Sequence, residues 1–322
     1  MEWTTIVLLA AAGIAALYLF AGFAVSSVLT FVIKRPMGRL ARPTYDRMRE
    51  ICGDFNYSIY DRMEKEAFVI RNRGAELKCV FVPAPDAGGT GRAKCVISAH
   101  GFGLNLMFSA RYVPMFHAMG YAAVIYDARG LGKSTGASSL GYFEKYDMAA
   151  IAGWVRARLG RDTIIGLHGE SLGAITSLEI LGVDPDIAFA IPDSCTTSFD
   201  SAFSGITHLP VFPFASVLNA LSKLFYKADM RDIRPIDRVA AANVPLLFIC
   251  GTNDKPTPHT ESEKLFAAAK NPLSRLELFE GAWHTGAYAH GKERYERVVR
   301  AFVGAVEEAL SPEVLKAGGH KR

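Results

Sequence analysis

TIIGLHGESLGAITSLEIL, residues 163–181, is the stretch that decides the fold. Its opening, Thr163–Leu167, is mostly apolar or β-branched and predicts a buried strand, whereas Ser171–Leu181 suits a helix. The G-x-S-x-G pattern centred on Ser171 lies between the two. A tight strand-to-helix turn needs such small residues, and it holds its serine exposed at the end of the strand. The stretch therefore predicts an α/β sheet with Ser171 as a candidate nucleophile. The alternative is a serine that only caps a helix.

The same alternation of short apolar runs and amphipathic stretches continues on both sides of this turn. Further strands are expected at Ala67–Arg71, Glu76–Val82, Lys94–Ala99, Ala122–Tyr126, Asp186–Pro192, Val244–Cys250 and Leu276–Phe279, and further helices at Ser109–Met119, Tyr142–Leu159 and His290–Leu310. Strand–helix alternation predicts a mostly parallel sheet with helices on both faces. Functional residues of such sheets gather at the carboxyl ends of the strands.

A serine hydroxyl needs a base to activate it, and the base needs an acid to orient it. Asp254 follows the predicted strand Val244–Cys250, and His284 follows Leu276–Phe279 in a glycine-rich loop. The chain order of serine, acid and histidine is the order found with this strand–turn–helix serine. Asp193 also ends a predicted strand and is the alternative acid. We therefore predict a triad of Ser171, Asp254 and His284.

Two backbone N–H groups are expected to stabilise the oxyanion of a tetrahedral intermediate. One is that of Leu172, directly after the serine, and the other is that of Phe102, in the loop after the strand Lys94–Ala99. His100 in the same loop is expected to orient it.

A second glycine-containing loop, Asp127–Ser134, lacks the spacing of a phosphate-binding loop, which excludes an NTPase. We expect a structural turn in which Asp127 and Arg129 bond neighbouring backbone.

Taken together, these motifs resemble those of the α/β-hydrolase superfamily, and within it the bacterial membrane-anchored, serine-aminopeptidase-like hydrolases of broad esterase type. The matching pieces are His100-Gly101-Phe102-Gly103, Asp127 to Ser134, Gly169-Glu170-Ser171-Leu172-Gly173, Gly251-Thr252-Asn253-Asp254 and Gly281-Ala282-Trp283-His284. The resemblance implies an eight-stranded sheet with an antiparallel second strand, a Ser–His–Asp triad, and neither cofactor nor metal. The chain departs from it at Trp283, where glycine is common, and at Cys250, where histidine often stands. Trp283 could narrow the site beside His284.

The segment 194–243, between two predicted strands, is long enough for a lid over the serine. Its apolar content, with Phe203, Phe212 and Phe214, suggests a substrate with a hydrophobic acyl or aromatic group, and a lipid-like ester is plausible. The alternative is that these residues pack a helix onto the sheet.

The N-terminal part carries 28 consecutive uncharged residues, Ile6–Ile33. A membrane-spanning helix needs about 20 apolar residues, so this run predicts a transmembrane anchor. A buried core helix would be shorter, and a signal peptide would have a shorter apolar region behind positive charges. Six Lys and Arg residues lie in 34–50, which favours a cytoplasmic body. The same segment could also lie on anionic lipid headgroups.

The chain thus divides into an anchor (1–33), a basic linker and lead-in (34–65), an α/β-hydrolase domain (66–310) and a tail (311–322). Its 322 residues are 50% hydrophobic, which excludes a disordered chain. The positive charge lies near the two ends, so no basic stripe supports nucleic-acid binding. Five scattered cysteines without a CxxC pair argue against a disulfide framework or zinc site and favour a reducing compartment.

The leading hypothesis is a serine hydrolase that cleaves a carboxylic ester, acting on a small-molecule ester or lipid-like substrate at the membrane. A peptidase, an acyltransferase or a perhydrolase with the same triad is the alternative within this chemistry. A membrane-tethered binding scaffold without catalysis is the alternative from another class, and the intact Ser–Asp–His set argues against it.

Overall fold

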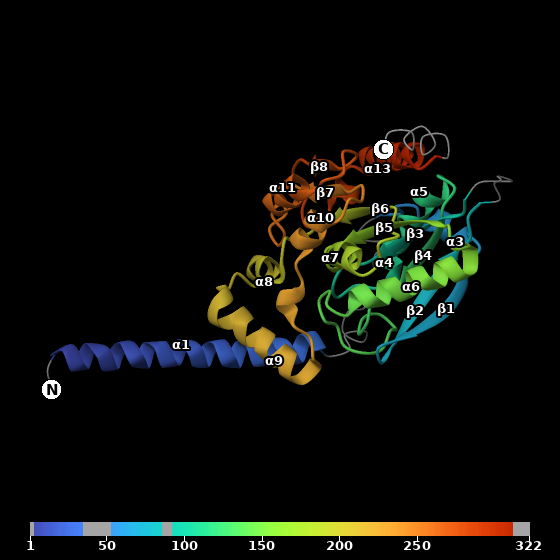
Figure 1. Ribbon diagram of the computed structural model, residues 1–322. Coiled ribbons are helices and arrows are strands. Elements are labelled where there is room, and N and C mark those ends of the chain that lie inside the picture. Colours follow the sequence, from blue (N-terminus) through green and yellow to red (C-terminus); the bar gives the residue numbers. More distant parts are fainter. Residues whose placement is uncertain (1–2, 35–52, 86–91, 312–322) are drawn as a thin grey trace, which may run out of the picture.

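The computed structural model describes residues 3–34, 53–85 and 92–311. A long N-terminal helix, α1 (Trp3–Lys34), projects from an α/β body, and a small helical layer lies between the two (Figure 1). Most of the predicted basic segment 34–50 and almost all of the tail 311–322 lie outside the described residues.

The body is built on one eight-stranded sheet in the order β1-β2-β4-β3-β5-β6-β7-β8. Its strands are β1 (Glu66–Asn72), β2 (Ala75–Val82), β3 (Lys94–Ala99), β4 (Ala122–Tyr126), β5 (Ile164–Glu170), β6 (Phe189–Asp193), β7 (Leu247–Gly251) and β8 (Arg275–Phe279). β2 is antiparallel to both β1 and β4, and every pairing from β4 to β8 is parallel. The predicted fold, with its antiparallel second strand, is confirmed.

Helices cover both faces of the sheet, as the continuous apolar character of the central strands requires. They are α3 (Tyr57–Arg62), α4 (Leu106–Ala110), α5 (Val113–His117), α6 (Glu144–Leu159), α7 (Leu172–Glu179), α10 (Pro235–Ala241), α11 (His259–Ala268), α12 (Ala287–His290) and α13 (Lys292–Ala309), with short 3-10 turns η2 (Ile180–Gly182) and η4 (Met230–Asp232). The single helix predicted over Ser109–Met119 is wrong. Two short helices stand there because Pro114 lacks an N–H donor and favours the first turn of a new helix.

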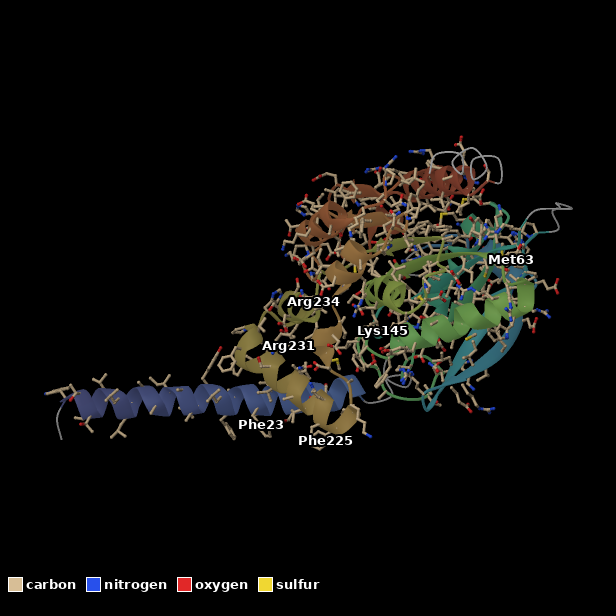
Figure 2. All side chains as sticks on the ribbon, in the orientation of Figure 1. Phe23, Met63, Lys145, Phe225, Arg231 and Arg234 are labelled. Atoms are coloured by element: carbon tan, nitrogen blue, oxygen red, sulfur yellow. The ribbon has the colours of Figure 1, made fainter. Side chains whose placement is uncertain are left out.

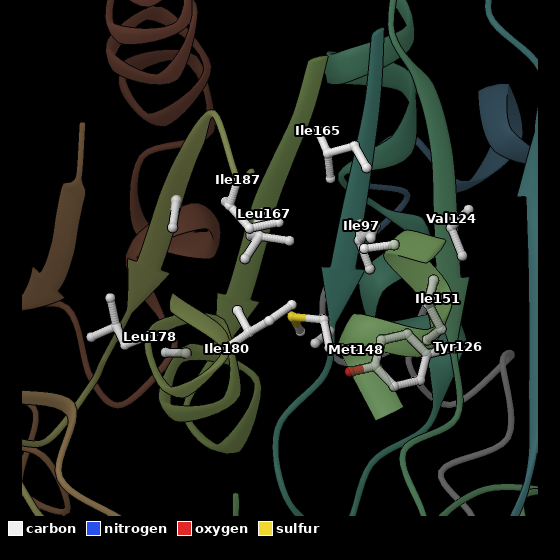
Figure 3. Packing of buried hydrophobic residues seen from close by; sticks show 14 of the residues in the cluster. Ile97, Val124, Tyr126, Met148, Ile151, Ile165, Leu167, Leu178, Ile180 and Ile187 are labelled. Carbon is white, nitrogen blue, oxygen red and sulfur yellow. The ribbon is translucent and has the colours of Figure 1, made fainter. Parts of the chain in front are cut away.

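Alternate residues of each central strand enter separate cores. Ile97 of β3 packs with Met148 and Ile151 of α6 on one face (Figure 3). Its neighbour Val96 belongs to the core on the other face, where α13 contributes Phe302. A rigid sheet buried on both faces fixes the strand ends that carry the candidate site.

The segment between β6 and β7 folds into two parts. α10 packs on α7 and α11 of the body. α8 (Phe199–Thr207), the π-helical turn η3 (Val211–Ala215) and α9 (Ser216–Tyr226) form a separate layer with its own apolar cluster, which we call the cap (residues 199–226). Only part of the predicted lid segment therefore stands away from the sheet.

One face of α1 is docked on the cap. The Tyr18 hydroxyl donates to the Phe212 carbonyl at 3.0 Å, and the Ser26 hydroxyl donates to the Phe214 carbonyl at 2.7 Å. Between these two contacts Gly22 lies so close to Pro213 that an added Cβ would meet its ring at 2.4 Å. The stretch Trp3–Thr30 is long and apolar enough to cross a membrane. A core helix or a signal sequence can have the same length and composition. The hydrogen bonds with Phe212 and Phe214 show in addition that α1 packs on the cap.

Candidate active site

Ser171 lies on a strained turn between β5 and α7, with φ of 53° and ψ of −111°. The flanking glycines allow this turn. A Cβ on Gly169 would lie 2.2 Å from the Gly173 carbonyl oxygen, and one on Gly173 would lie 2.1 Å from the Ala99 carbonyl oxygen. Both approaches are to backbone, so neither neighbour can move aside easily. The G-x-S-x-G spacing is thus required by packing between β3, β5 and α7.

The three residues of the predicted triad lie within hydrogen-bonding distance of one another. His284 Nε2 is 3.0 Å from Ser171 Oγ, and His284 Nδ1 is 3.0 Å from each carboxylate oxygen of Asp254. Asp254 follows β7 and His284 follows β8, so three separate strand ends supply the set. The alternative acid, Asp193, ends β6 fully buried and accepts instead from the Ser194 hydroxyl at 3.1 Å.

The environment of Asp254 keeps it ionised. Burial alone would raise its pKa, but hydrogen bonds from His284 and Thr257 outweigh burial and hold the pKa of Asp254 below its ordinary value. An ionised carboxylate can only accept, so the proton between the two side chains belongs to His284 Nδ1. His284 Nε2 is then free to accept the proton of the Ser171 hydroxyl.

Two residues that the sequence analysis missed support this arrangement. Thr257 donates its backbone N–H to Asp254 Oδ1 at 2.8 Å and its hydroxyl to Asp254 Oδ2 at 2.7 Å. Ser194 accepts the N–H of Thr285, the residue after His284, at 3.0 Å. Thr257 follows Asp254 by only three residues, and that spacing was the available signal. Ser194 is far from His284 in the sequence, so only the fold brings them together.

Both backbone N–H groups predicted for the oxyanion are available. In the described part of the chain, neither Phe102 N–H nor Leu172 N–H donates to another protein group. Both residues line the same cavity as Ser171. The loop that carries Phe102 also lies close to the serine, because a Cβ on Gly101 would be 3.4 Å from Ser171 Cβ.

His100 joins this loop to its neighbour. Its Nδ1 lies 2.8 Å from the Gly101 carbonyl and its Nε2 accepts the Ala128 N–H at 3.0 Å, consistent with the orienting role expected of it.

In the following turn, Asp127 accepts the backbone N–H groups of Leu106 and Lys133 at 2.7 Å each, as expected. Arg129 instead forms its main contacts with a side chain, since it pairs with the buried Asp147 at 2.7 Å. Arg129 also donates to the backbone carbonyl of Asn72 at 3.4 Å, so the expected backbone contact is present beside the ion pair that the sequence did not predict.

Beneath the serine lies a buried polar cluster. Glu170, directly before Ser171, receives hydrogen bonds at 2.7 Å from Arg111 and from the Tyr112 hydroxyl. Arg111 also lies 3.7 Å over the ring of Phe108. Burial raises the pKa of Glu170, although Arg111 and Tyr112 counteract it. This cluster holds the end of β5 in place below the turn that carries Ser171.

A cavity of about 250 Å³ opens beside Ser171. Its walls come from the loop after β3, from α7, from the cap and from α1, and they are apolar except for Ser171 and Thr207. The lining residues are Leu29, Phe102, Leu140, Ser171, Leu172, Ile175, Phe199, Ala202, Phe203, Ile206, Thr207, Leu218 and Ile233. The cap thus covers the candidate nucleophile.

Two of the aromatic residues named in the sequence analysis have different surroundings. Phe203 lines the cavity, whereas Phe214 packs edge to face on Tyr18 of α1. Trp283 is 57% exposed and outside the lining, so it does not narrow the cavity as expected.

Among residues 3–34, 53–85 and 92–311 no cluster of His, Cys, Asp and Glu is arranged to hold a metal ion. The cysteines described there (Cys79, Cys95, Cys195 and Cys250) are buried and free.

Comparison with known proteins agrees with this fold. The family model of X-Pro dipeptidyl-peptidase (S15 family) matches residues 54–212. The protein YqkD of Bacillus subtilis is 25% identical over 311 residues, which cover 94% of this chain and 98% of that protein. The similarity to YqkD therefore includes at least part of the N-terminal helix as well as the body.

Solved structures share the architecture at low sequence identity. An esterase of Pyrococcus furiosus, Pf2001, superposes with a TM-score of 0.60 at 22% identity, covering 79% of this chain and 95% of the esterase. The acylaminoacyl peptidase of Pyrococcus horikoshii gives a TM-score of 0.58 at 17% identity, covering 77% of this chain and 43% of that enzyme. The sheet order, the serine turn and these matches together show that the chain has the α/β-hydrolase fold.

Proposed function

We propose that the protein is a serine hydrolase that cleaves carboxylic esters with a hydrophobic acyl group through an acyl-enzyme. The observation that carries this proposal is the continuous series of contacts from Ser171 Oγ through His284 to Asp254, at 3.0 Å each. Two unpaired backbone N–H groups beside the serine support it, because they are the donors that an oxyanion requires.

In the first half-reaction, Ser171 Oγ attacks the ester carbonyl carbon while its proton passes to His284 Nε2. The N–H groups of Phe102 and Leu172 stabilise the negative charge that develops on the carbonyl oxygen. The bond to the leaving oxygen then breaks, and His284 gives its proton to the departing alcohol. Asp254 stabilises the imidazolium that exists between these two proton transfers.

In the second half-reaction, water attacks the acyl-enzyme and gives one proton to His284 Nε2. The bond from the carbonyl carbon to Ser171 Oγ breaks, and the proton returns to the serine. The products are a carboxylic acid and an alcohol, and the enzyme is regenerated without a redox partner.

An ester is favoured over a peptide by the chemistry of the cavity. Apart from Ser171 itself, its only polar side chain is Thr207. Among the described residues that line it, none is charged and able to bind a peptide terminus. A peptidase remains the second candidate, since the S15 family model matches residues 54–212.

We further propose that α1 spans a membrane and that the body lies in the cytoplasm. The length and apolar composition of α1 support the span. The six positive residues of 34–50 support the orientation, because such residues are retained on the cytoplasmic side.

The experiment that tests the catalytic proposal uses the full chain in detergent or vesicles. Wild-type protein should react with a fluorophosphonate probe and hydrolyse 4-nitrophenyl esters, and Ser171→Ala should do neither while keeping its circular dichroism spectrum. Ser262→Ala, which removes a buried serine hydroxyl on α11, should still be labelled. Full labelling of Ser171→Ala would contradict the assignment, and faster cleavage of matched anilides than of esters would favour the peptidase.

A further inference from the structure

We propose that the cap is seated in the leaflet on the body side of the membrane, and that the substrate is a fatty acyl ester resident in that leaflet. Its chain would enter the cavity between α1 and the cap without crossing water. This inference rests on the proposed function of Ser171 and on α1 as a membrane span, and it adds the source and class of the substrate.

The depth of the cap follows from the length of α1. The apolar run of 28 residues, Ile6–Ile33, is longer than the hydrocarbon core, which about 20 helical residues cross. Every window of about 20 residues within that run includes residues 14–25. Tyr18 and Gly22 therefore lie in hydrocarbon wherever the helix is placed. Phe212 and Pro213 of the cap contact those two residues, so η3 lies at the same depth.

The hydrogen bonds between α1 and the cap are those that such a depth requires. Irregular backbone in hydrocarbon is tolerated only where its polar groups find partners within the protein. The Phe212 and Phe214 carbonyls belong to the irregular turn η3, and they accept from Tyr18 and Ser26 of α1. The carbonyls of this irregular turn therefore find their partners on α1.

The outer surface of the cap exposes several large apolar side chains beside a few charged ones such as Lys223, which pairs with Asp229. Its exposed side chains include Ile206, Phe212, Leu224 and Phe225, each more than 60% exposed. In Figure 2, Phe225 of α9 and Phe23 of α1 lie on the same outer side of the α1–α9 pair. α8 and the η3–α9 segment together are long and apolar enough for a broken membrane span or a re-entrant loop, and they are bent by 111°. The apolar surface of the cap thus continues that of α1, and the bilayer that surrounds α1 also covers the cap.

The cavity opens near the end of α1 that leads into the body, beside the cap. Ile206 both lines the cavity and is 62% exposed, so it lies at the mouth, and Leu29 of α1 lines the same cavity. If the hydrocarbon ends as early as Val25, Leu29 lies only about 6 Å beyond it, within the headgroup layer. If the hydrocarbon ends at Ile33, Leu29 is inside it. An acyl chain can therefore pass from the leaflet to Ser171, with its ester at the boundary between hydrocarbon and headgroups.

The first test fills the mouth from the side of α1. We compare Leu29→Trp with Val28→Trp, whose residue is 62% exposed and outside the cavity lining, in full-chain protein in phosphatidylcholine vesicles. Each variant is assayed with water-soluble 4-nitrophenyl acetate and with 4-nitrophenyl palmitate dissolved in the bilayer. Leu29→Trp should lower the ratio of palmitate to acetate kcat/KM at least tenfold, and Val28→Trp should leave that ratio as in the wild type.

The outcomes separate this inference from the proposed function. If Ser171→Ala abolishes both activities but Leu29→Trp leaves the ratio unchanged, Ser171 is the nucleophile and the lipid route is wrong. If the wild-type protein hydrolyses neither ester and Ser171 is not labelled, the proposed function fails, and the inference fails with it.

The second test measures depth without relying on activity. Phe212→Trp and Ile59→Trp are placed in vesicles whose lipids carry bromine on the acyl chains, and quenching is compared with that of the wild type. Ile59 is 45% exposed on α3, at the end of the body away from α1 (Figure 1). The tryptophan at position 212 should be quenched strongly and the one at position 59 should not. Equal quenching at the two positions would place the cap outside the bilayer and overturn the inference.

Discussion

Thr257 Oγ1 lies 2.7 Å from Asp254 Oδ2 and 3.1 Å from His284 Nδ1, so a single hydroxyl touches both the acid and the base of the candidate triad. With its backbone N–H also bound to Asp254, Thr257 fixes the carboxylate at both oxygens. It is a positioning residue, because it acts on the reaction through Asp254.

Replacing Thr257 by Val should lower kcat/KM for an ester roughly 10- to 100-fold. A hydrogen bond to a charged group contributes about 1.5–3 kcal/mol, and each 1.4 kcal/mol of barrier is about tenfold in rate. Thr257→Ser keeps the hydroxyl and should restore at least a third of the activity. Steady-state kinetics on the three proteins check this. Unchanged activity in Thr257→Val would contradict this role of the hydroxyl.

Asp254→Asn should lower kcat by about 10⁴ while KM changes little, because the amide orients the wrong imidazole tautomer. Asp193→Asn should stay within a few-fold of the wild type. Burial and the nearby charge of Glu170 raise the pKa of Asp193 well above its ordinary value, which disfavours the charged form, and an amide has nearly the shape of the neutral carboxyl. A large loss in Asp193→Asn beside a near-normal Asp254→Asn would move the acid to β6.

His168 should make the protein less stable in mild acid. Its burial, and then the charge of Arg111, lower its pKa from 6.5 to about 3. Between these values the unfolded chain binds a proton that the folded protein does not, so stability falls as pH decreases below about 6.5. The loss is about 1.4 kcal/mol per pH unit.

His168→Asn serves as the comparison, since every other titrating group is shared with the wild type. Unfolding free energies from denaturant titrations at pH 7 and pH 5 should show a steeper fall for the wild type, by about 2 kcal/mol. Parallel pH dependence in the two proteins would assign the acid sensitivity to other groups.

The proposed orientation of α1 predicts that a C-terminal fluorescent protein reporter is active in the cytoplasm and that a C-terminal alkaline phosphatase is inactive. Replacing the six Lys and Arg residues of 34–50 by Gln should weaken or invert this result, since they retain the body. The same number of Lys and Arg replaced in 51–310 serves as the control. Phosphatase activity outside the membrane in the unaltered chain would reverse the orientation.

The strands could be predicted from the sequence because both faces of the sheet are buried and leave continuous apolar runs. Lys94–Ala99 and Ala122–Tyr126 are observed with the predicted bounds. β5 runs three residues further than predicted, to Glu170. The prediction ended the strand before this buried carboxylate, because its partner, Arg111, lies 59 residues earlier in the chain. A local sequence pattern cannot indicate that a charged residue is buried when its partner is so distant in the chain.

The sequence could name two candidates for the acid of the triad, but it could not decide between them. Asp193 and Asp254 both follow apolar strands, and the difference between them is that only Asp254 reaches His284. The contribution of Leu29 to the cavity left no signal at all, because a leucine in an apolar helix is the same residue whether it faces lipid or substrate.

The face of α1 formed by Gly22, Ser26 and Leu29 also bears on how the enzyme is produced and redesigned. A version shortened to begin at the body would lose one cavity wall and both hydrogen bonds to η3, and it would leave the apolar cluster of the cap uncovered. Substrate preferences recorded with such a version would describe a wider cavity than the natural one. Exchanging α1 for an unrelated membrane helix would have the same effect even if attachment were kept. We therefore expect α1 to contribute to the substrate specificity of the protein, so that another helix cannot replace it without changing that specificity.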